Sequence, residues 1–121
     1  MTLDISTRHV PLDAPTRELI ERRLAFALGR FAARVRSVTA RFEDLNGPRG
    51  GVDIQCRMEA VLVPRGQVLV EVTDVTAEAA ATRGAQRLAR RIRTVIEARR
   101  GRRRRSPSVR AATGEPSLAA G

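Results

Sequence analysis

Hydrophobic and polar side chains alternate at every second position in four segments of the chain, which is the pattern of strands with one buried face. Polar residues occupy the intervening positions, so we expect an antiparallel sheet that is covered on one side only. Pro64 and Gly66 predict a tight turn before the last strand, because proline presets φ and glycine permits a positive φ. The side chains expected to face inwards are Leu3 and Ile5; Val38, Ala40 and Phe42; Val52, Ile54, Cys56, Met58, Ala60 and Leu62; and Val68, Val70 and Val72.

Two further segments carry hydrophobic side chains at spacings of three and four residues, which is the pattern of a helix with one buried face. The first is expected to run from about 14 to 33, with Asp13 as its N-cap and Pro15 in its first turn. Gly29 is expected to weaken this helix without ending it. The second is expected to run from about 76 to 99, and alanine and glycine fill the first half of its buried stripe. Small side chains there would let it lie close to the sheet or to the first helix.

The order of these elements predicts a β-α-β-β-β-α chain, an α+β two-layer sandwich with a four-stranded sheet and two helices on one face. The length of 121 residues suits a single domain, which we expect to comprise residues 1–100. Residues 101–121 contain four consecutive arginines and then mostly serine, proline, alanine and glycine. This composition is too poor in core-forming side chains to fold alone, so a disordered basic tail is expected there.

Charge is distributed unevenly along the chain. All 23 basic residues are arginine, and the formal net charge is +10. Residues 1–82 hold eleven arginines and eleven acidic residues, whereas residues 83–121 hold twelve arginines and only two acidic residues, Glu97 and Glu115. The whole excess therefore lies in the last third of the chain, as expected for a protein with a polyanionic partner.

Arginines cover one face of the second predicted helix. Arg83, Arg87 and Arg90 fall in a narrow sector opposite the hydrophobic stripe, and Arg91 and Arg93 flank that sector. Like charges at this spacing destabilise a helix by roughly 0.2–0.5 kcal/mol per pair, so a partner that supplies negative charge explains them well. Arginine also forms bidentate hydrogen bonds with phosphate. The alternative is a solvated basic face near a helix C-terminus, where positive charge favours the helix dipole.

The first predicted helix adds further candidates for contact with RNA, because Arg23 and Arg30 lie along one of its flanks. Phe26 lies off the hydrophobic stripe and is expected to tuck against a loop, with stacking on a base as the alternative. Arg22 lies among acidic residues and is expected to form an ordinary surface ion pair. The candidate RNA-binding residues are therefore Arg83, Arg87, Arg90, Arg91, Arg93, Arg23 and Arg30.

The scarcity of aromatic, histidine and cysteine side chains limits which functions are expected. There is no tryptophan or tyrosine and there are three phenylalanines, so we expect recognition of nucleic-acid backbone and shape rather than stacking along a single strand. His9 and Cys56 are the only histidine and cysteine, too few for a zinc site. Cys56 lies on the inward face of its strand, where a thiol is usually inert. We therefore expect a binding protein and not an enzyme, with no catalytic residue, metal, cofactor or small-molecule substrate.

The chain also lacks the signals of a membrane or secreted protein. No segment approaches the roughly 20 hydrophobic residues that span a bilayer. The N-terminal residues have neither the basic start nor the hydrophobic stretch of a secretory signal. Because a lone cysteine forms no internal disulfide, a reducing compartment is expected. These features predict a cytoplasmic protein with no membrane partner.

Four stretches of the chain carry a recognisable pattern over about residues 1–100. They are Leu3-Asp4-Ile5 with Arg8-His9-Val10, Arg17-Glu18 with Leu24 and Gly29-Arg30-Phe31, Cys56-Arg57-Met58-Glu59-Ala60, and Arg87-Leu88-Ala89-Arg90-Arg91-Ile92. In these stretches the chain resembles the ribosome hibernation promoting factor and protein Y family, in its short form. The resemblance implies a β-α-β-β-β-α fold that docks in the small ribosomal subunit near the decoding region. There it would block the messenger and transfer RNA sites of stressed or resting bacterial cells.

The resemblance also implies basic positions on the last helix, which correspond here to Arg87, Arg90 and Arg93, with Arg83 and Arg91 extending the surface. The function expected from the residues and the resemblance together is a ribosome-associated translation inhibitor, or hibernation factor. Its partners would be the small ribosomal subunit and its ribosomal RNA. The alternative is a general binder of structured RNA or other nucleic acid that is not specific to ribosomes.

Overall fold

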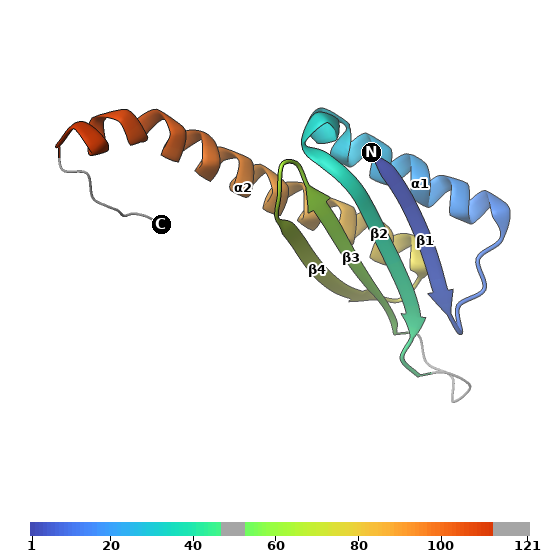
Figure 1. Ribbon diagram of the computed structural model, residues 1–121. Coiled ribbons are helices and arrows are strands. Elements are labelled where there is room, and N and C mark those ends of the chain that lie inside the picture. Colours follow the sequence, from blue (N-terminus) through green and yellow to red (C-terminus); the bar gives the residue numbers. More distant parts are fainter. Residues whose placement is uncertain (47–52, 113–121) are drawn as a thin grey trace.

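The computed structural model describes the backbone of residues 1–46 and 53–112, and the side chains of residues 1–46 and 53–102. The strands form one four-stranded sheet in the order β1-β2-β3-β4, and both α-helices lie on one face of it (Figure 1). The predicted two-layer α+β sandwich with the order β-α-β-β-β-α is confirmed. In chain order the elements are β1 (Thr2–Arg8), α1 (Ala14–Leu28), the 3-10 helix η1 (Gly29–Arg34), β2 (Val35–Asp44), β3 (Ile54–Leu62), β4 (Gln67–Asp74) and α2 (Ala77–Ala112).

The sheet is mixed, which corrects the expectation of an antiparallel sheet. β1 runs parallel to β2, with Ile5 opposite Ala40, whereas the β2–β3 and β3–β4 pairs are antiparallel. The helix α1 causes the difference, because it carries the chain back along the sheet before β2 begins, as parallel strands require. Side chains alternate with the same period in both kinds of pair, so the hydrophobic pattern alone does not distinguish them.

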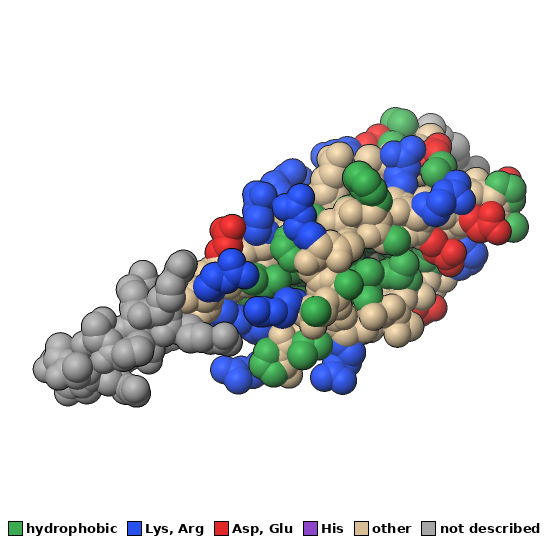
Figure 2. Space-filling view, turned by 90° about the horizontal axis from the view of Figure 1, so that it is seen from above, with side chains coloured by type: hydrophobic (Ala, Val, Ile, Leu, Met, Phe, Trp, Pro, Cys, Tyr) green, Lys and Arg blue, Asp and Glu red, His purple; other side chains and the backbone are tan. Residues whose placement is uncertain are grey.

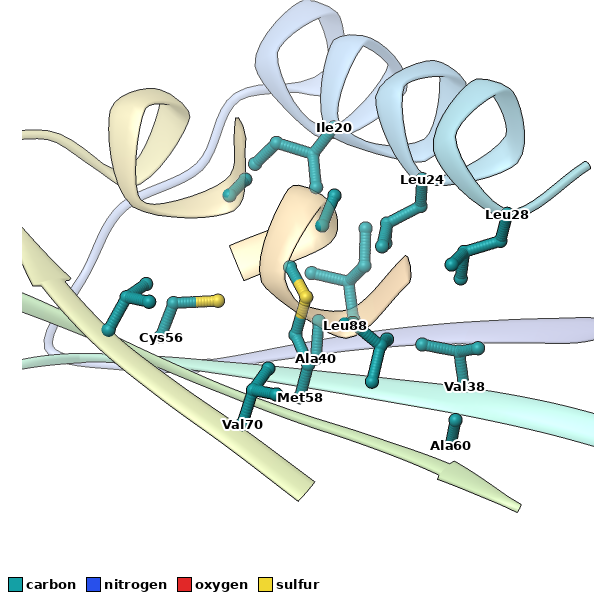
Figure 3. Packing of buried hydrophobic residues seen from close by; sticks show 14 of the residues in the cluster. Ile20, Leu24, Leu28, Val38, Ala40, Cys56, Met58, Ala60, Val70 and Leu88 are labelled. Carbon is teal, nitrogen blue, oxygen red and sulfur yellow. The ribbon is translucent and has the colours of Figure 1, made fainter. Parts of the chain in front are cut away.

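The core lies between the sheet and the two helices, as the alternation predicts (Figure 3). Among the side chains expected to face inwards, Leu3 is only partly buried and Val52 lies outside the described residues; all the others are buried. The helix α2 buries Ile96 and leaves Val95 half-buried. The helical side of the core is formed mainly by Ile20, Leu24 and Leu28 of α1, Phe31 of η1, and Ala81, Ala85, Leu88 and Ile92 of α2.

The first helix begins as predicted but ends earlier. The carboxylate of Asp13 accepts a hydrogen bond of 2.9 Å from the backbone N–H of Thr16, and Pro15 lies in the first turn. The α-helix ends at Leu28, and a 3-10 helix follows from Gly29 to Arg34. The expectation that Gly29 does not end the helix is therefore wrong. A tighter 3-10 turn is a common ending for a helix, and here it contains the buried Phe31.

The small residues of α2 allow it to lie close to the sheet. A Cβ added to Gly84 would lie 3.1 Å from Cε and 3.2 Å from Sδ of Met58, and 3.6 Å from Sγ of Cys56. Ala80 and Ala81, one turn earlier, are also buried. The predicted close approach of this helix is confirmed, and at Gly84 the strand that it meets is β3.

The helix α2 is longer than its hydrophobic pattern indicates. It runs to Ala112, well past the expected end at Arg99 (Figure 1). Residues 101–112, expected to be disordered, continue the helix, while residues 113–121 of the expected tail lie outside the described residues. Arginine is a good helix former, and Gly101 costs only about 1 kcal/mol within a helix. None of the described helices is both long and apolar enough to cross a membrane.

Candidate nucleic-acid interface

The arginines of α2 lie on two different flanks of the helix. On the β4 flank, Nη1 of Arg83 donates a hydrogen bond of 2.9 Å to the backbone oxygen of Thr73 and lies 3.3 Å from Oδ2 of Asp74. One turn further on, Nη1 of Arg87 donates a hydrogen bond of 3.1 Å to the backbone oxygen of Glu71. Because β4 is the last strand of the sheet, these two side chains hold α2 against its outer edge.

The other flank of α2 faces α1, and a groove of about 780 Å³ runs between the two helices. We call it the α1–α2 groove. Its charged lining consists of Arg22, Arg23, Arg30, Arg90 and Arg93, and its apolar lining of Leu19, Phe26, Ala27, Phe31, Ala85 and Ala89. Thr82 and Gln86 complete it, so no carboxylate is among the lining residues. Figure 2, seen from above the view of Figure 1, shows basic side chains beside exposed apolar ones.

Among the described residues, the arginines of the groove have no carboxylate partner. Within residues 1–46 and 53–102, the ion pairs join Arg57 to Glu71 and Arg83 to Asp74. The surface ion pair expected for Arg22 is absent from this part of the chain, so that prediction is wrong. Arg30 instead lies over the ring of Phe31, with Cζ 5.8 Å from the ring centroid. Five uncompensated positive charges around one concave surface create a site that attracts anions.

Phe26 borders the α1–α2 groove and is 91% exposed. The expectation that it tucks against a loop is wrong. It lies on the outer side of α1, one turn after Arg22, and Arg30 follows four residues later in η1, so that all three border the groove. The only other phenylalanines, Phe31 and Phe42, are buried as predicted.

The outer face of the sheet has a different character. Its exposed side chains carry both signs of charge, and Glu71 on β4 accepts hydrogen bonds of 3.0 and 2.8 Å from Nε and Nη2 of Arg57 on β3. Arg41 on β2 is opposite Arg57, and Glu59 follows Arg57 two residues later on the same face of β3. A surface of mixed charge has no strong field for a polyanion, so the helical side is the candidate interface.

The two residues with reactive side chains lie apart from the groove. Cys56 is fully buried, and burial raises the pKa of its thiol to about 12, so it remains protonated at neutral pH. His9 lies in a bend after β1 with a positive φ of 61°. No group of three or more potential metal ligands occurs among the described residues. The features that distinguish the helical side are its charge and shape.

Four of the seven candidate residues come together in the structure: Arg23, Arg30, Arg90 and Arg93 line the α1–α2 groove. Arg83 and Arg87 lie on the opposite flank of α2, and Arg91 is exposed outside the groove. The predicted single row of arginines is therefore divided. Two groove residues, Arg22 and Phe26, are absent from the candidate set. The signal that could have found them is the four-residue spacing from Arg22 through Phe26 to Arg30.

Neither a family model nor a curated protein matches the chain, whereas solved structures do. The N-terminal domain of protein Y from Thermus thermophilus has a TM-score of 0.65 and 21% identity, over 78% of this chain and 99% of that one. A ribosomal subunit interface protein from Coxiella burnetii has a TM-score of 0.57 and 12% identity, over 84% of this chain and 99% of that one. These similarities confirm that the chain has the fold implied by its resemblance to protein Y.

Proposed function

We propose that this protein is a ribosome-associated translation inhibitor, a hibernation factor of bacterial cells, which binds the RNA of the small ribosomal subunit. The observation that carries the proposal is the α1–α2 groove, where five arginines surround a concave surface and have no carboxylate partner in the described part of the chain. Two proteins with the same fold are a protein Y domain and a ribosomal subunit interface protein. A cytoplasmic location follows from a ribosomal partner.

The arginines have the chemistry that RNA backbone recognition requires. A guanidinium group has five N–H donors in a planar fork, which matches the geometry of phosphate oxygens. In the proposed complex, Arg23, Arg30, Arg90 and Arg93 contact phosphates from the groove. Arg83 and Arg87 each use one nitrogen to bind β4, so their remaining donors, with those of Arg91, extend the basic surface. Occupancy of the decoding region would inhibit translation without any catalytic step.

The same groove supports a second candidate function, general binding of structured RNA. Contacts with phosphates position a protein on RNA but do not read its sequence. A groove whose charged lining is entirely arginine would therefore bind many folded RNAs through the same groups. Only the location of the protein in cells, or competition between ribosomal and other RNA, separates this candidate from the first.

Sedimentation of the tagged full chain from stationary-phase bacterial lysates tests the proposal. The groove variant is Arg90→Glu/Arg93→Glu. The control is Arg36→Glu/Arg41→Glu, which changes the charge equally at two exposed positions of β2 outside the groove. We expect the wild type and the control to co-migrate with small subunits, and the groove variant to remain at the top of the gradient. In a translation extract, the wild type and the control should inhibit translation and the groove variant should not.

Two outcomes would contradict this proposal. If the wild-type protein is found in all RNA-containing fractions and is not enriched on small subunits, the general RNA binder is favoured. If the groove variant still co-migrates with small subunits at moderate salt, the arginines of the α1–α2 groove are not the binding site.

A further inference from the structure

We infer that the α1–α2 groove accommodates an unpaired nucleotide, whose base stacks on Phe26 while the surrounding arginines hold its phosphates. The inference deepens the proposed function and rests on it only in taking RNA as the ligand. It replaces the expectation, drawn from composition, that recognition involves backbone and shape alone.

The placement of Phe26 carries the first step. Its ring is almost fully exposed at the edge of the groove, so it contributes little to the core. The other large hydrophobic side chains that are exposed in the described part of the chain are Met1, Leu45, Leu69 and Val75, and none of them lines the groove. Phe26 therefore offers a flat apolar surface within a basic one.

The charges around Phe26 carry the second step. Arg22 lies one turn before it on α1, Arg30 lies four residues after it in η1, and Arg90 and Arg93 line the groove from α2. Aromatic rings and guanidinium planes both stack on bases, and guanidinium groups also bind phosphates. A nucleotide presents these two partners together, an aromatic base and an anionic backbone.

The third argument is the size of the site. A volume of about 780 Å³ lies within the roughly 300–1,000 Å³ typical of small-ligand sites. Bases within a duplex are already stacked on their neighbours, so only an unpaired or flipped-out base can offer its face to Phe26. An acidic protein segment would satisfy the arginines but would leave the phenyl ring without a flat aromatic partner, so we take the nucleotide as the occupant.

A single fluorescent side chain tests this directly. The chain contains no tryptophan and no tyrosine, so the full-length Phe26→Trp variant reports only from the groove. Three RNA hairpins serve as probes: one with a single unpaired adenosine, one with an abasic residue at that position, and one fully paired. We expect the unpaired adenosine to quench the indole, and the abasic and paired hairpins to leave it nearly unchanged. Leu69→Trp, on the exposed outer face of β4, is the matched control and should not respond.

Affinity measurements give a second readout. Stacking of one base on an aromatic side chain is worth roughly a 5- to 150-fold change in affinity. The wild type should therefore prefer the hairpin with the unpaired adenosine to the abasic one by at least about 5-fold. Phe26→Ala should lose this preference but keep the salt dependence of the wild type, because the phenyl ring makes no phosphate contact.

Equal binding of the three hairpins by the wild type would overturn the inference, as would a Phe26→Trp variant that binds without quenching. A blue shift without quenching, seen only with ribosomal proteins, would indicate a protein occupant and would overturn it too. The sedimentation experiment keeps the two proposals distinct. Co-migration with small subunits but no stacking refutes the nucleotide site alone, whereas stacking without co-migration refutes the ribosomal function alone.

Discussion

The two flanks of α2 carry the same kind of side chain but have different roles in the structure. On the β4 flank, Arg83 and Arg87 donate hydrogen bonds to backbone oxygens of an edge strand. On the α1 flank, Arg90 and Arg93 line a groove, and their side chains have no hydrogen bond or ion pair within the described residues. The first pair stabilises the fold, and the second pair is available to a ligand.

The difference shows that the neighbouring element decides what an arginine does. A β-strand edge offers unpaired carbonyl oxygens that accept from a guanidinium group. The neighbouring helix α1 has its own hydrogen bonds satisfied internally and, together with η1, adds three more arginines instead. Charge repulsion therefore accumulates on the α1 flank and is relieved on the β4 flank. Matched pairs of substitutions can separate these two roles.

The largest effect is expected from Arg90→Gln/Arg93→Gln on the α1 flank. Loss of two charged hydrogen bonds to phosphate should lower the affinity for small-subunit RNA by roughly 100-fold at moderate salt. The slope of log K against log salt should flatten by about 1.4–1.8, since each phosphate contributes roughly 0.7–0.9. Filter binding over a salt series measures both quantities. Thermal unfolding should be unchanged, and an unaltered slope would show that these residues make no phosphate contact.

The matched pair on the β4 flank, Arg83→Gln/Arg87→Gln, should have the reverse effect. Two hydrogen bonds to β4 are lost, at roughly 0.5–1.5 kcal/mol each, so the free energy of unfolding should fall by about 1–3 kcal/mol. Urea denaturation measures this change. The affinity for RNA should fall only about three-fold, because part of the long-range attraction is removed. If affinity falls as far as in the α1-flank variant, the two flanks are functionally equivalent and the comparison is wrong.

The side of α2 that faces the sheet packs over Cys56 of β3, whose thiol should make the stability depend on pH. The thiol of Cys56 has a pKa of about 12 in the folded protein against an ordinary value of 9.0. The neutral thiol is therefore favoured by folding, and its contribution is complete below pH 9 and is lost as the pH rises towards 12. The free energy of unfolding should fall by about 1.4 kcal/mol per pH unit in that window.

Chemical denaturation at pH 8, 10 and 11 tests this. The chain has no lysine or tyrosine, the other side chains that lose a proton in this range. Cys56→Ala should therefore remove most of the pH dependence, at the expense of roughly 1 kcal/mol or more of stability at pH 8. A slope that is the same in the wild type and in Cys56→Ala would exclude Cys56 as its source.

The smallest effect is expected from Gly84→Ala, on the same side of α2. Alanine favours the helix by about 1 kcal/mol, but its Cβ would lie 3.1 Å from Cε of Met58 and so would overpack the core. Overpacking costs roughly 1–3 kcal/mol, so a net loss of about 1 kcal/mol is expected by urea denaturation. RNA affinity should be unchanged, and a change comparable to that of either arginine pair would mean that α2 shifts as a body.

The sequence predicts most of the fold because its signals are local. Alternation identifies the strands, and Asp13 marks the start of α1 through its own hydrogen bond to Thr16. The parallel pairing of β1 with β2 is not predicted, because alternation is the same in parallel and antiparallel pairs. The end of α1 at Leu28 is also missed, since the packing of Phe31 in a 3-10 turn overrides the helical spacing.

The candidate site is predicted less well because it depends on which elements become neighbours. A helical wheel places Arg83, Arg87 and Arg90 in one row, but β4 lies on one side of that row and α1 on the other. Nothing within α2 itself reveals this. Arg22 is assigned to an ion pair from its acidic neighbours in the chain, although in the structure it lines the groove instead.

The position of the α1–α2 groove between the first and the last helix has a consequence for synthesis of the protein. Arg23 is made early and Arg90 late, so the groove is absent from a nascent chain until α2 has been released and has packed on the sheet. Contacts between segments so distant in the chain form slowly during folding. A truncated product that lacks α2 would expose the apolar face of the sheet and would have no binding site. A nascent chain therefore acquires the α1–α2 groove only when α2 has been made and has packed beside α1.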